Sequence, residues 1–97
     1  PMLLHQLRQM NAHLNGIAEQ FGASRLRVFG SVARGEETAE SDVDFLVELP
    51  RGYDLINQRM PLTQKLADIL NRKVELIPEH ELNTHMRQKI LAEAVSL

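Results

Sequence analysis

Hydrophobic residues in the first fifth of the chain recur at steps of three and four positions, the spacing of one face of an amphipathic helix. Gly22 follows this stretch, and glycine often ends a helix because it adopts the left-handed conformation without steric cost. We therefore predict a continuous helix over residues 3–21. The stripe consists of Leu3, Leu4, Leu7, Met10, Leu14, Ile17, Ala18 and Phe21.

Three later segments alternate apolar and polar residues, as half-buried strands do. The alternation predicts that Val43, Phe45 and Val47 point to one side of the second strand and that Asp42, Asp44 and Leu46 point to the other. By the same rule Phe29, Leu46 and Ile77 share the acidic side, where core packing is favoured over a nucleotide-base or partner site. The segments read "SRLRVFGS" from residue 24, "DVDFLVEL" from residue 42 and "RKVELIP" from residue 72.

Helical patterns separate and follow these strands. Residues 32–41 are polar and predict a short helix or turn with a loop. A second amphipathic stripe starts at Leu55 and includes Arg59, Leu62, Leu66, Ile69 and Leu70, with Asn71 as its stop; Pro61 predicts a kink, or a helix proper that begins near Met60. Asn83 is a good N-cap for a last helix. The order α-β-α-β-α-β-α predicts one α/β (α+β) domain over residues 1–97, with a small mixed sheet of about three strands flanked by helices.

Composition excludes several classes of protein. The 97 residues include no cysteine, so neither a disulfide framework nor a thiolate metal site is possible. The net charge of −2 argues against general electrostatic binding of nucleic acid. The apolar runs are too short to span a membrane, and the N-terminal residues lack the pattern of a signal peptide. We therefore expect a cytoplasmic protein that binds no membrane.

Three acidic residues are the first candidates for chemistry. A carboxylate within a strand is costly unless it is solvated, paired or bound to a cation. Asp42 and Asp44 lie on the same side of their strand, and Glu75 faces outward from the third strand. If these strands are neighbours, the three carboxylates converge. Oxygen donors alone suit Mg²⁺ or Mn²⁺ better than zinc.

A possible phosphate site precedes these acids. A glycine after a strand, here Gly30, lets backbone N–H groups approach a phosphate closely, and Ser31 adds a hydroxyl donor. Arg34, in the loop after Ser31, is either a guanidinium donor to the same ligand or a solvent-facing loop residue. An anion site beside a cation site is what a magnesium nucleoside triphosphate requires.

The segment "GS", ten residues and then "DVD" resembles the G-S-x10-D-x-D signature of the DNA polymerase β-like nucleotidyltransferase superfamily. The blocks "RVFGSVARGE", "SDVDFLVEL" and "LADILNRKVELI" are most similar to the minimal MNT-type domains, the antitoxins of HEPN/MNT toxin–antitoxin pairs. The resemblance implies that Gly30 and Ser31 hold the triphosphate of ATP and that Asp42 and Asp44 hold the metal ions. Glu75 would be the third acid, where many relatives carry aspartate.

The same resemblance implies a function. Such antitoxins transfer AMP from ATP to a tyrosine of their HEPN partner, a ribonuclease, and so silence it. Two other readings stay open. The chain could neutralise its partner by binding alone, or it could be the catalytic half of a two-subunit transferase that nucleotidylates a small molecule.

Overall fold

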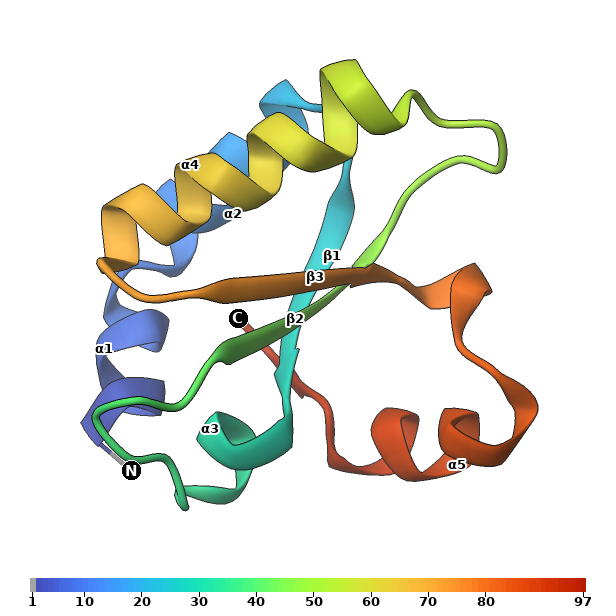
Figure 1. The fold of residues 1–97 in the computed structure, drawn as a ribbon. Coiled ribbons are helices and arrows are strands. Elements are labelled where there is room, and N and C mark those ends of the chain that lie inside the picture. The colour runs from blue at the N-terminus through green and yellow to red at the C-terminus, as the bar shows by residue number, and fades with distance from the viewer. Residues whose placement is uncertain (1) are drawn as a thin grey trace.

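A four-stranded sheet with the order β3-β2-β1-β4 organises the computed structural model, which describes residues 2–97 (Figure 1). β2 runs parallel to β3 and antiparallel to β1, and β4 adds antiparallel to β1. The predicted mixed sheet is confirmed, but the expectation of three strands was one too few, because a two-residue strand is too short to show an alternating pattern. The strands are β1 (Ser24–Phe29), β2 (Val43–Glu48), β3 (Val74–Pro78) and β4 (Val95–Ser96).

The predicted continuous helix over residues 3–21 is wrong, because the helix is interrupted at Met10 and divides into α1 (Met2–Gln9) and α2 (Asn11–Gln20). The N–H of Met10 lies 3.2 Å from the Gln6 carbonyl and 3.1 Å from that of Leu7, so the turn tightens there. Leu7 and Leu14 are both fully buried on either side of the break. The hydrophobic stripe therefore reports which side of the chain faces the core, and it continues across a change of helix axis.

The remaining helices begin and end close to the predicted residues. α4 begins at Met60 with Pro61 in its first turn, and it ends at Asn71, which is left-handed with φ of 53°. The Asn83 side chain accepts a hydrogen bond from the Met86 N–H at 2.9 Å and caps α5 as predicted. None of the helices between Met2 and Leu97 has the length and apolar character needed to cross a bilayer. The helices are α1 (Met2–Gln9), α2 (Asn11–Gln20), α3 (Gly30–Arg34), the π-helical turn η1 (Leu55–Arg59), α4 (Met60–Leu70), the 3₁₀ turn η2 (Glu79–Glu81) and α5 (Thr84–Glu93).

The sheet carries apolar clusters on both faces. The larger one joins strand residues such as Phe45 and Val47 to α1, α2 and α4. On the opposite face Phe29 and Leu46 pack against Ile90 of α5, with Ile77 at the margin. Figure 1 shows α2 and α4 on one side of the strands and α5 on the other. The apolar residues beside the acids are therefore core, as the sequence favoured.

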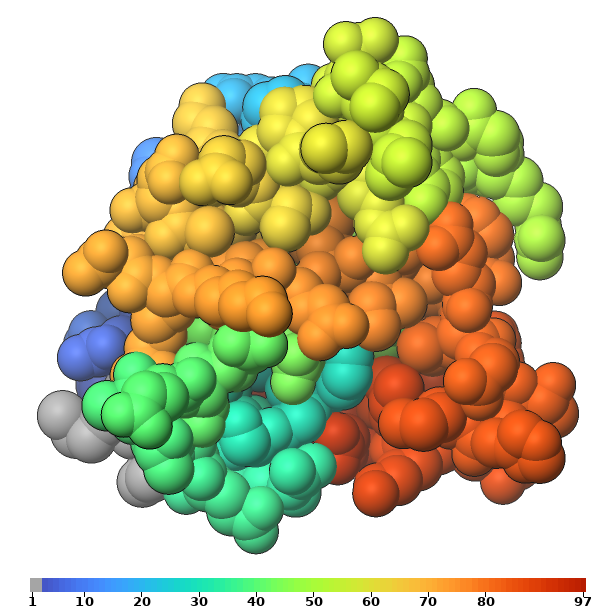
Figure 2. Space-filling view, viewed as in Figure 1, coloured from blue at the N-terminus to red at the C-terminus, as the bar shows by residue number. Residues whose placement is uncertain are grey.

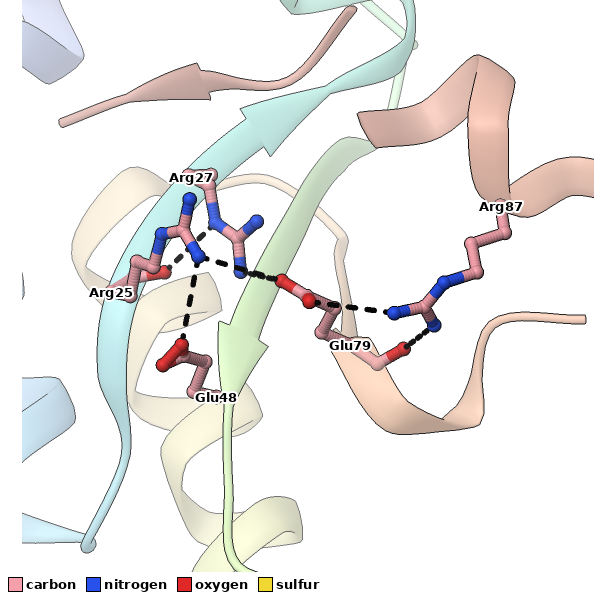
Figure 3. Close-up of polar contacts among 5 residues, drawn as sticks. All are labelled: Arg25, Arg27, Glu48, Glu79 and Arg87. Carbon is pink, nitrogen blue, oxygen red and sulfur yellow. Dashed lines mark hydrogen bonds and ion pairs between the residues drawn. The ribbon is translucent and has the colours of Figure 1, made fainter. Parts of the chain in front are cut away.

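A charged cluster fixes η2 and α5 against β1 at one end of this second face (Figure 3). The buried Arg27 guanidinium lies 2.6 Å from Glu79 Oε1, and this close contact is the main reason that the pKa of the Glu79 carboxyl is lowered. Arg87 of α5 lies 3.7 Å from the other oxygen of Glu79 and donates to the Glu79 carbonyl at 3.3 Å. These contacts hold the segment after β3 in place and so determine where α5 lies on the sheet.

Candidate functional site

The end of β1 meets the start of β2 at a point where only glycine fits. Phe29 is the partner of Asp44 in the β1–β2 ladder, so Gly30 follows directly beside Asp44. Gly30 has φ of +74°, and a Cβ atom placed on it would lie 2.3 Å from Asp44 Oδ2. The left-handed conformation and the missing side chain together bring the Gly30 backbone into contact with the Asp44 carboxylate. The structure therefore brings these two predicted site residues together.

The β2–β3 register brings in the third predicted acid. Asp44 and Glu75 are direct partners in the parallel ladder, so their carboxylates are neighbours on the same face of the sheet. Burial and then the charge of Glu75 raise the pKa of Asp44 to about 6, with smaller contributions from Asp42 and Glu93. The end of the sheet thus concentrates negative charge around a half-buried carboxyl.

Asp42 lies one residue before β2, and its side chain is 36% exposed. Its Oδ2 atom is 3.9 Å from the Lys73 ammonium, a loose ion pair with a mostly exposed lysine. Among residues 2–97, no three carboxylates or imidazoles are arranged to enclose an ion as they stand. The donor set nevertheless suits Mg²⁺ or Mn²⁺, because all three side chains offer oxygen and the raised pKa of Asp44 marks negative charge that a cation would offset.

A fourth acid, Glu93, belongs to the site and was not among the predicted residues. The Gly30 N–H donates to Glu93 Oε2 at 2.7 Å, and Arg34 Nη1 donates to Glu93 Oε1 at 2.9 Å. Glu93 is 63 residues from Gly30 in the chain, so no local motif connects the two. One signal was available: Glu93 follows Ile90 by three positions, which places it on the sheet-facing side of the last helix.

Arg34 and Ser31 complete the set of predicted residues. The Arg34 guanidinium also donates to Glu36 Oε1 at 2.9 Å, and the hydrogen bonds of Glu36 and Glu93 raise its pKa. Ser31 lies next to Gly30 in the first turn of α3, and its carbonyl accepts from the Glu36 N–H at 2.9 Å. All six predicted site residues therefore lie at one end of the sheet, with Arg34 held between two carboxylates.

A groove of 510 Å³ runs along the open edge of β3, where η1 and α4 meet the strand. Leu55, Met60 and Thr63 line one side, and residues 74–76 line the other. Figure 2 looks onto this edge, with η1 and α4 in yellow-green and yellow above β3 in orange. Leu55, the first residue of the predicted amphipathic stripe, is 49% exposed and so does not belong to its buried part. The wide turn of η1 changes the angular step between residues and takes Leu55 out of the stripe that α4 buries.

Comparisons with known proteins show which family the chain is similar to. The model of the nucleotidyltransferase domain family matches residues 10–97. The protein adenylyltransferase MntA of Thermococcus cleftensis is 33% identical over 86 residues, which cover 89% of this chain and 86% of that protein.

Two solved structures share the fold. One described as a minimal nucleotidyltransferase superposes with a TM-score of 0.83 at 36% identity, covering 97% of this chain and 95% of the other. A chain of a toxin–antitoxin complex crystallised with AMP-PNP gives a TM-score of 0.71 at 25% identity, covering 84% and 66% of the two chains.

Proposed function

The chain belongs to the nucleotidyltransferase domain family, and we propose that it is an antitoxin that transfers AMP from ATP to a tyrosine hydroxyl of a HEPN-type ribonuclease toxin. Relatives named protein adenylyltransferases and a structural neighbour from a toxin–antitoxin complex support this proposal. The observation that carries it is the contact of the Gly30 backbone with Asp44, which in turn pairs with Glu75 across the strands.

We assign the donors of the phosphate site to the Gly30 N–H, the Ser31 hydroxyl and the Arg34 guanidinium. The acids Asp42, Asp44 and Glu75 would hold Mg²⁺ or Mn²⁺, whose positive charge offsets the charge that develops on the transferred phosphoryl group. Because Asp44 has a pKa of about 6 without a cation, it is mostly ionised at neutral pH and is ready to serve as a ligand. The pairing of Glu75 with Asp44 across the strands and the effect of its charge on the pKa of Asp44 support a role for Glu75 as the third acid.

The order of the strands gives the direction from which the acceptor approaches. Gly30 directly follows β1, Asp44 is on β2 and Glu75 is on β3, so the phosphate donors and Glu75 flank the central acid from opposite sides. In phosphoryl-type transfer the attacking and leaving oxygens lie roughly in line with the phosphorus. With pyrophosphate leaving over Gly30, the acceptor hydroxyl arrives from the β3 side.

The surface on that side suits a protein acceptor. The groove along β3 includes Glu75, and the apolar side chains beside it are solvent-exposed, at 49% for Leu55, 65% for Ile56 and 55% for Met60. Exposed apolar side chains gathered in one place are typical of interaction surfaces. We assign this surface to the segment of the partner that carries the acceptor tyrosine.

One experiment tests the proposed function against its alternatives. The protein is incubated with Mg²⁺, ATP and the product of the neighbouring gene, and the intact mass of each chain is measured. We expect the partner to gain the mass of one or more AMP groups, and we expect Asp44→Asn to abolish the gain while the two chains still associate. If Asp44→Asn still neutralises the partner without any gain in mass, the protein acts by binding alone and not by AMP transfer. Nucleotide found only on a small molecule would identify the two-subunit transferase.

A further inference from the structure

The carboxylate of Glu93 occupies two of the three donors that the proposed function assigns to phosphate, those of Gly30 and Arg34. One oxygen accepts from the Gly30 N–H at 2.7 Å, and the other accepts from Arg34 Nη1 at 2.9 Å. The Glu93 side chain is only 18% exposed and its hydrogen bond to Gly30 is partly buried, whereas the Arg34 side chain is 42% exposed. An anion therefore already bridges the backbone of Gly30 and the guanidinium of Arg34.

A phosphate group and this carboxylate cannot both use the Gly30 N–H, and they compete for the Arg34 guanidinium. The Gly30 N–H has a single hydrogen, which makes one strong hydrogen bond. Arg34 gives its Nε–H to Glu36 and its Nη1–H to Glu93, so the guanidinium is engaged on two edges. A triphosphate that binds through the Gly30 N–H must take this donor from Glu93, and it must also approach a site where Glu93 adds to the charge of Asp44, Asp42 and Glu75.

We propose that Glu93 acts as an internal competitor of the nucleotide: its carboxylate holds the phosphate donors in the free protein and is displaced when the phosphates bind. This inference rests on the proposed function for the identity of the ligand. Glu93 then lowers the affinity for every phosphate ligand that uses these donors.

The displacement requires no rearrangement of the fold. Glu93 is the last residue of α5, and Ile90 anchors that helix in the apolar cluster with Phe29 and Leu46. Residues 95–96 are fixed independently as β4 in the ladder with β1. The glutamate side chain has several rotatable bonds, so its carboxylate can move away while α5 and β4 stay in place. When pyrophosphate leaves after transfer, the same carboxylate can return to Gly30 and Arg34.

The test measures binding of Mg–AMP-PNP and of magnesium pyrophosphate by calorimetry to the full chain and to its variants. Glu93→Ala removes the competitor, and Glu93→Gln keeps its shape but removes its charge. Glu36→Gln is the matched control, because Glu36 also bonds Arg34 at 2.9 Å and carries the same charge but does not contact Gly30. We expect Glu93→Ala to bind both ligands on the order of tenfold more tightly, the change that corresponds to releasing one charge-assisted hydrogen bond in the free protein.

Glu93→Gln should fall between the wild type and Glu93→Ala, and Glu36→Gln should stay within about twofold of the wild type because its charge is screened by solvent. Equal or weaker binding by a folded Glu93→Ala variant would overturn the inference, as would an equal gain in Glu36→Gln. If the wild type binds AMP-PNP and transfers AMP while Glu93→Ala shows no gain, the proposed function stands and the competitor role falls. If Glu93→Ala binds more tightly but no chain gains AMP, the competitor role stands and the transfer does not. Absence of binding by all four proteins would refute both.

Discussion

A side chain on Gly30 would collide with Asp44, because a Cβ atom at residue 30 would lie 2.3 Å from the Asp44 Oδ2 atom. This contact fixes the distance between the proposed phosphate donor and the central acid. It depends on a left-handed glycine directly after β1, and on the pairing of Phe29 with Asp44 across the two strands. Any side chain at residue 30 should therefore disturb the site.

Gly30→Ala should lose AMP-PNP binding and AMP transfer, and it should lower the free energy of unfolding by more than the ~1 kcal/mol that a left-handed alanine costs by itself. Gly52→Ala is the matched control. Gly52 also has a positive φ, of +83°, but no atom lies within 4 Å of the position of its Cβ. Denaturant unfolding of both variants isolates the cost of the contact. An equal loss of stability in the two variants would show that Gly30 is needed only for its backbone conformation.

The raised pKa of Asp44 predicts an unusual dependence of stability on pH. The pKa of about 6 in the folded chain lies above the ordinary value of 3.8, so between these values the folded state binds the proton more tightly than the unfolded state. Without divalent cations, the contribution of Asp44 to stability should therefore be present at pH 4 and be lost as the pH rises through 6. Since the carboxyl is only half-buried, solvent screening limits this loss to about 1 kcal/mol.

Asp44→Asn should remove this dependence and be more stable than the wild type at pH 7, although it is inactive. Thermal unfolding in EDTA between pH 4.5 and pH 7.5 measures the effect, with Asp68→Asn on the surface of α4 as a control. A wild type that becomes more stable than Asp44→Asn as the pH rises would contradict the predicted charge repulsion at the site.

The charged cluster around Glu79 lies on the face of the sheet that α5 covers, at the end away from Gly30. It should contribute to the free energy of unfolding mainly through the buried Arg27. Glu79→Gln leaves the Arg27 guanidinium, which is 5% exposed, without its carboxylate partner at 2.6 Å. We expect Glu79→Gln to lower the free energy of unfolding by about 2–4 kcal/mol, because an unpaired buried charge is costly. Glu48→Gln removes a carboxylate that lies 3.7 Å from Arg25, and both of those side chains are well exposed.

The Glu48→Gln control should lose no more than about 0.5 kcal/mol of its free energy of unfolding. Urea unfolding at pH 7 measures both variants. Because the pKa of Glu79 is lowered in the folded chain, its contribution should be present above its ordinary pKa of 4.5 and should be lost as the pH falls below it. Similar losses in the two variants would show that the Arg27–Glu79 pair has no special role.

Changes in the groove along β3 should weaken binding of the partner protein without affecting binding of the nucleotide. The double change Leu55→Ser and Ile56→Ser should raise the KM for the partner protein at least about tenfold by removing exposed apolar contacts, and it should leave the affinity for AMP-PNP unchanged. Met86→Ser is the control, because Met86 is 46% exposed on α5, away from this groove. An unchanged KM in the double variant would move the acceptor surface elsewhere.

Much of the site could be predicted from the sequence because its members lie within strands and their adjoining turns. Alternation alone places Asp42 and Asp44 on one side, and the glycine after β1 marks a close approach of the backbone. The register that makes Asp44 and Glu75 direct partners depends on which strands are neighbours, and the pattern of each strand alone does not determine this. The resemblance to the family was what favoured convergence of these acids before the fold was known.

Other features depend on contacts that a local pattern does not contain. Glu93 reaches Gly30 only because α5 packs against the sheet, with its Ile90 in the same apolar cluster as Phe29 of β1. The break at Met10 preserves the hydrophobic stripe, so periodicity could not reveal it. β4 has two residues and takes its structure from pairing with Arg27 and Val28, which no intrinsic preference of such a short segment could determine.

The most direct test of the central claim is the position of the label after reaction with ATP labelled at either the α- or the γ-phosphate, in the presence of Mg²⁺ and the partner protein. Transfer of AMP breaks the bond between the α- and β-phosphates and leaves the α-phosphate on the acceptor oxygen. We expect the α-label, but not the γ-label, on the partner, and we expect no label when Asp44 is replaced by asparagine. A γ-label on the partner, or the absence of α-label from it under conditions where the two chains form a complex, would contradict adenylyl transfer by this site.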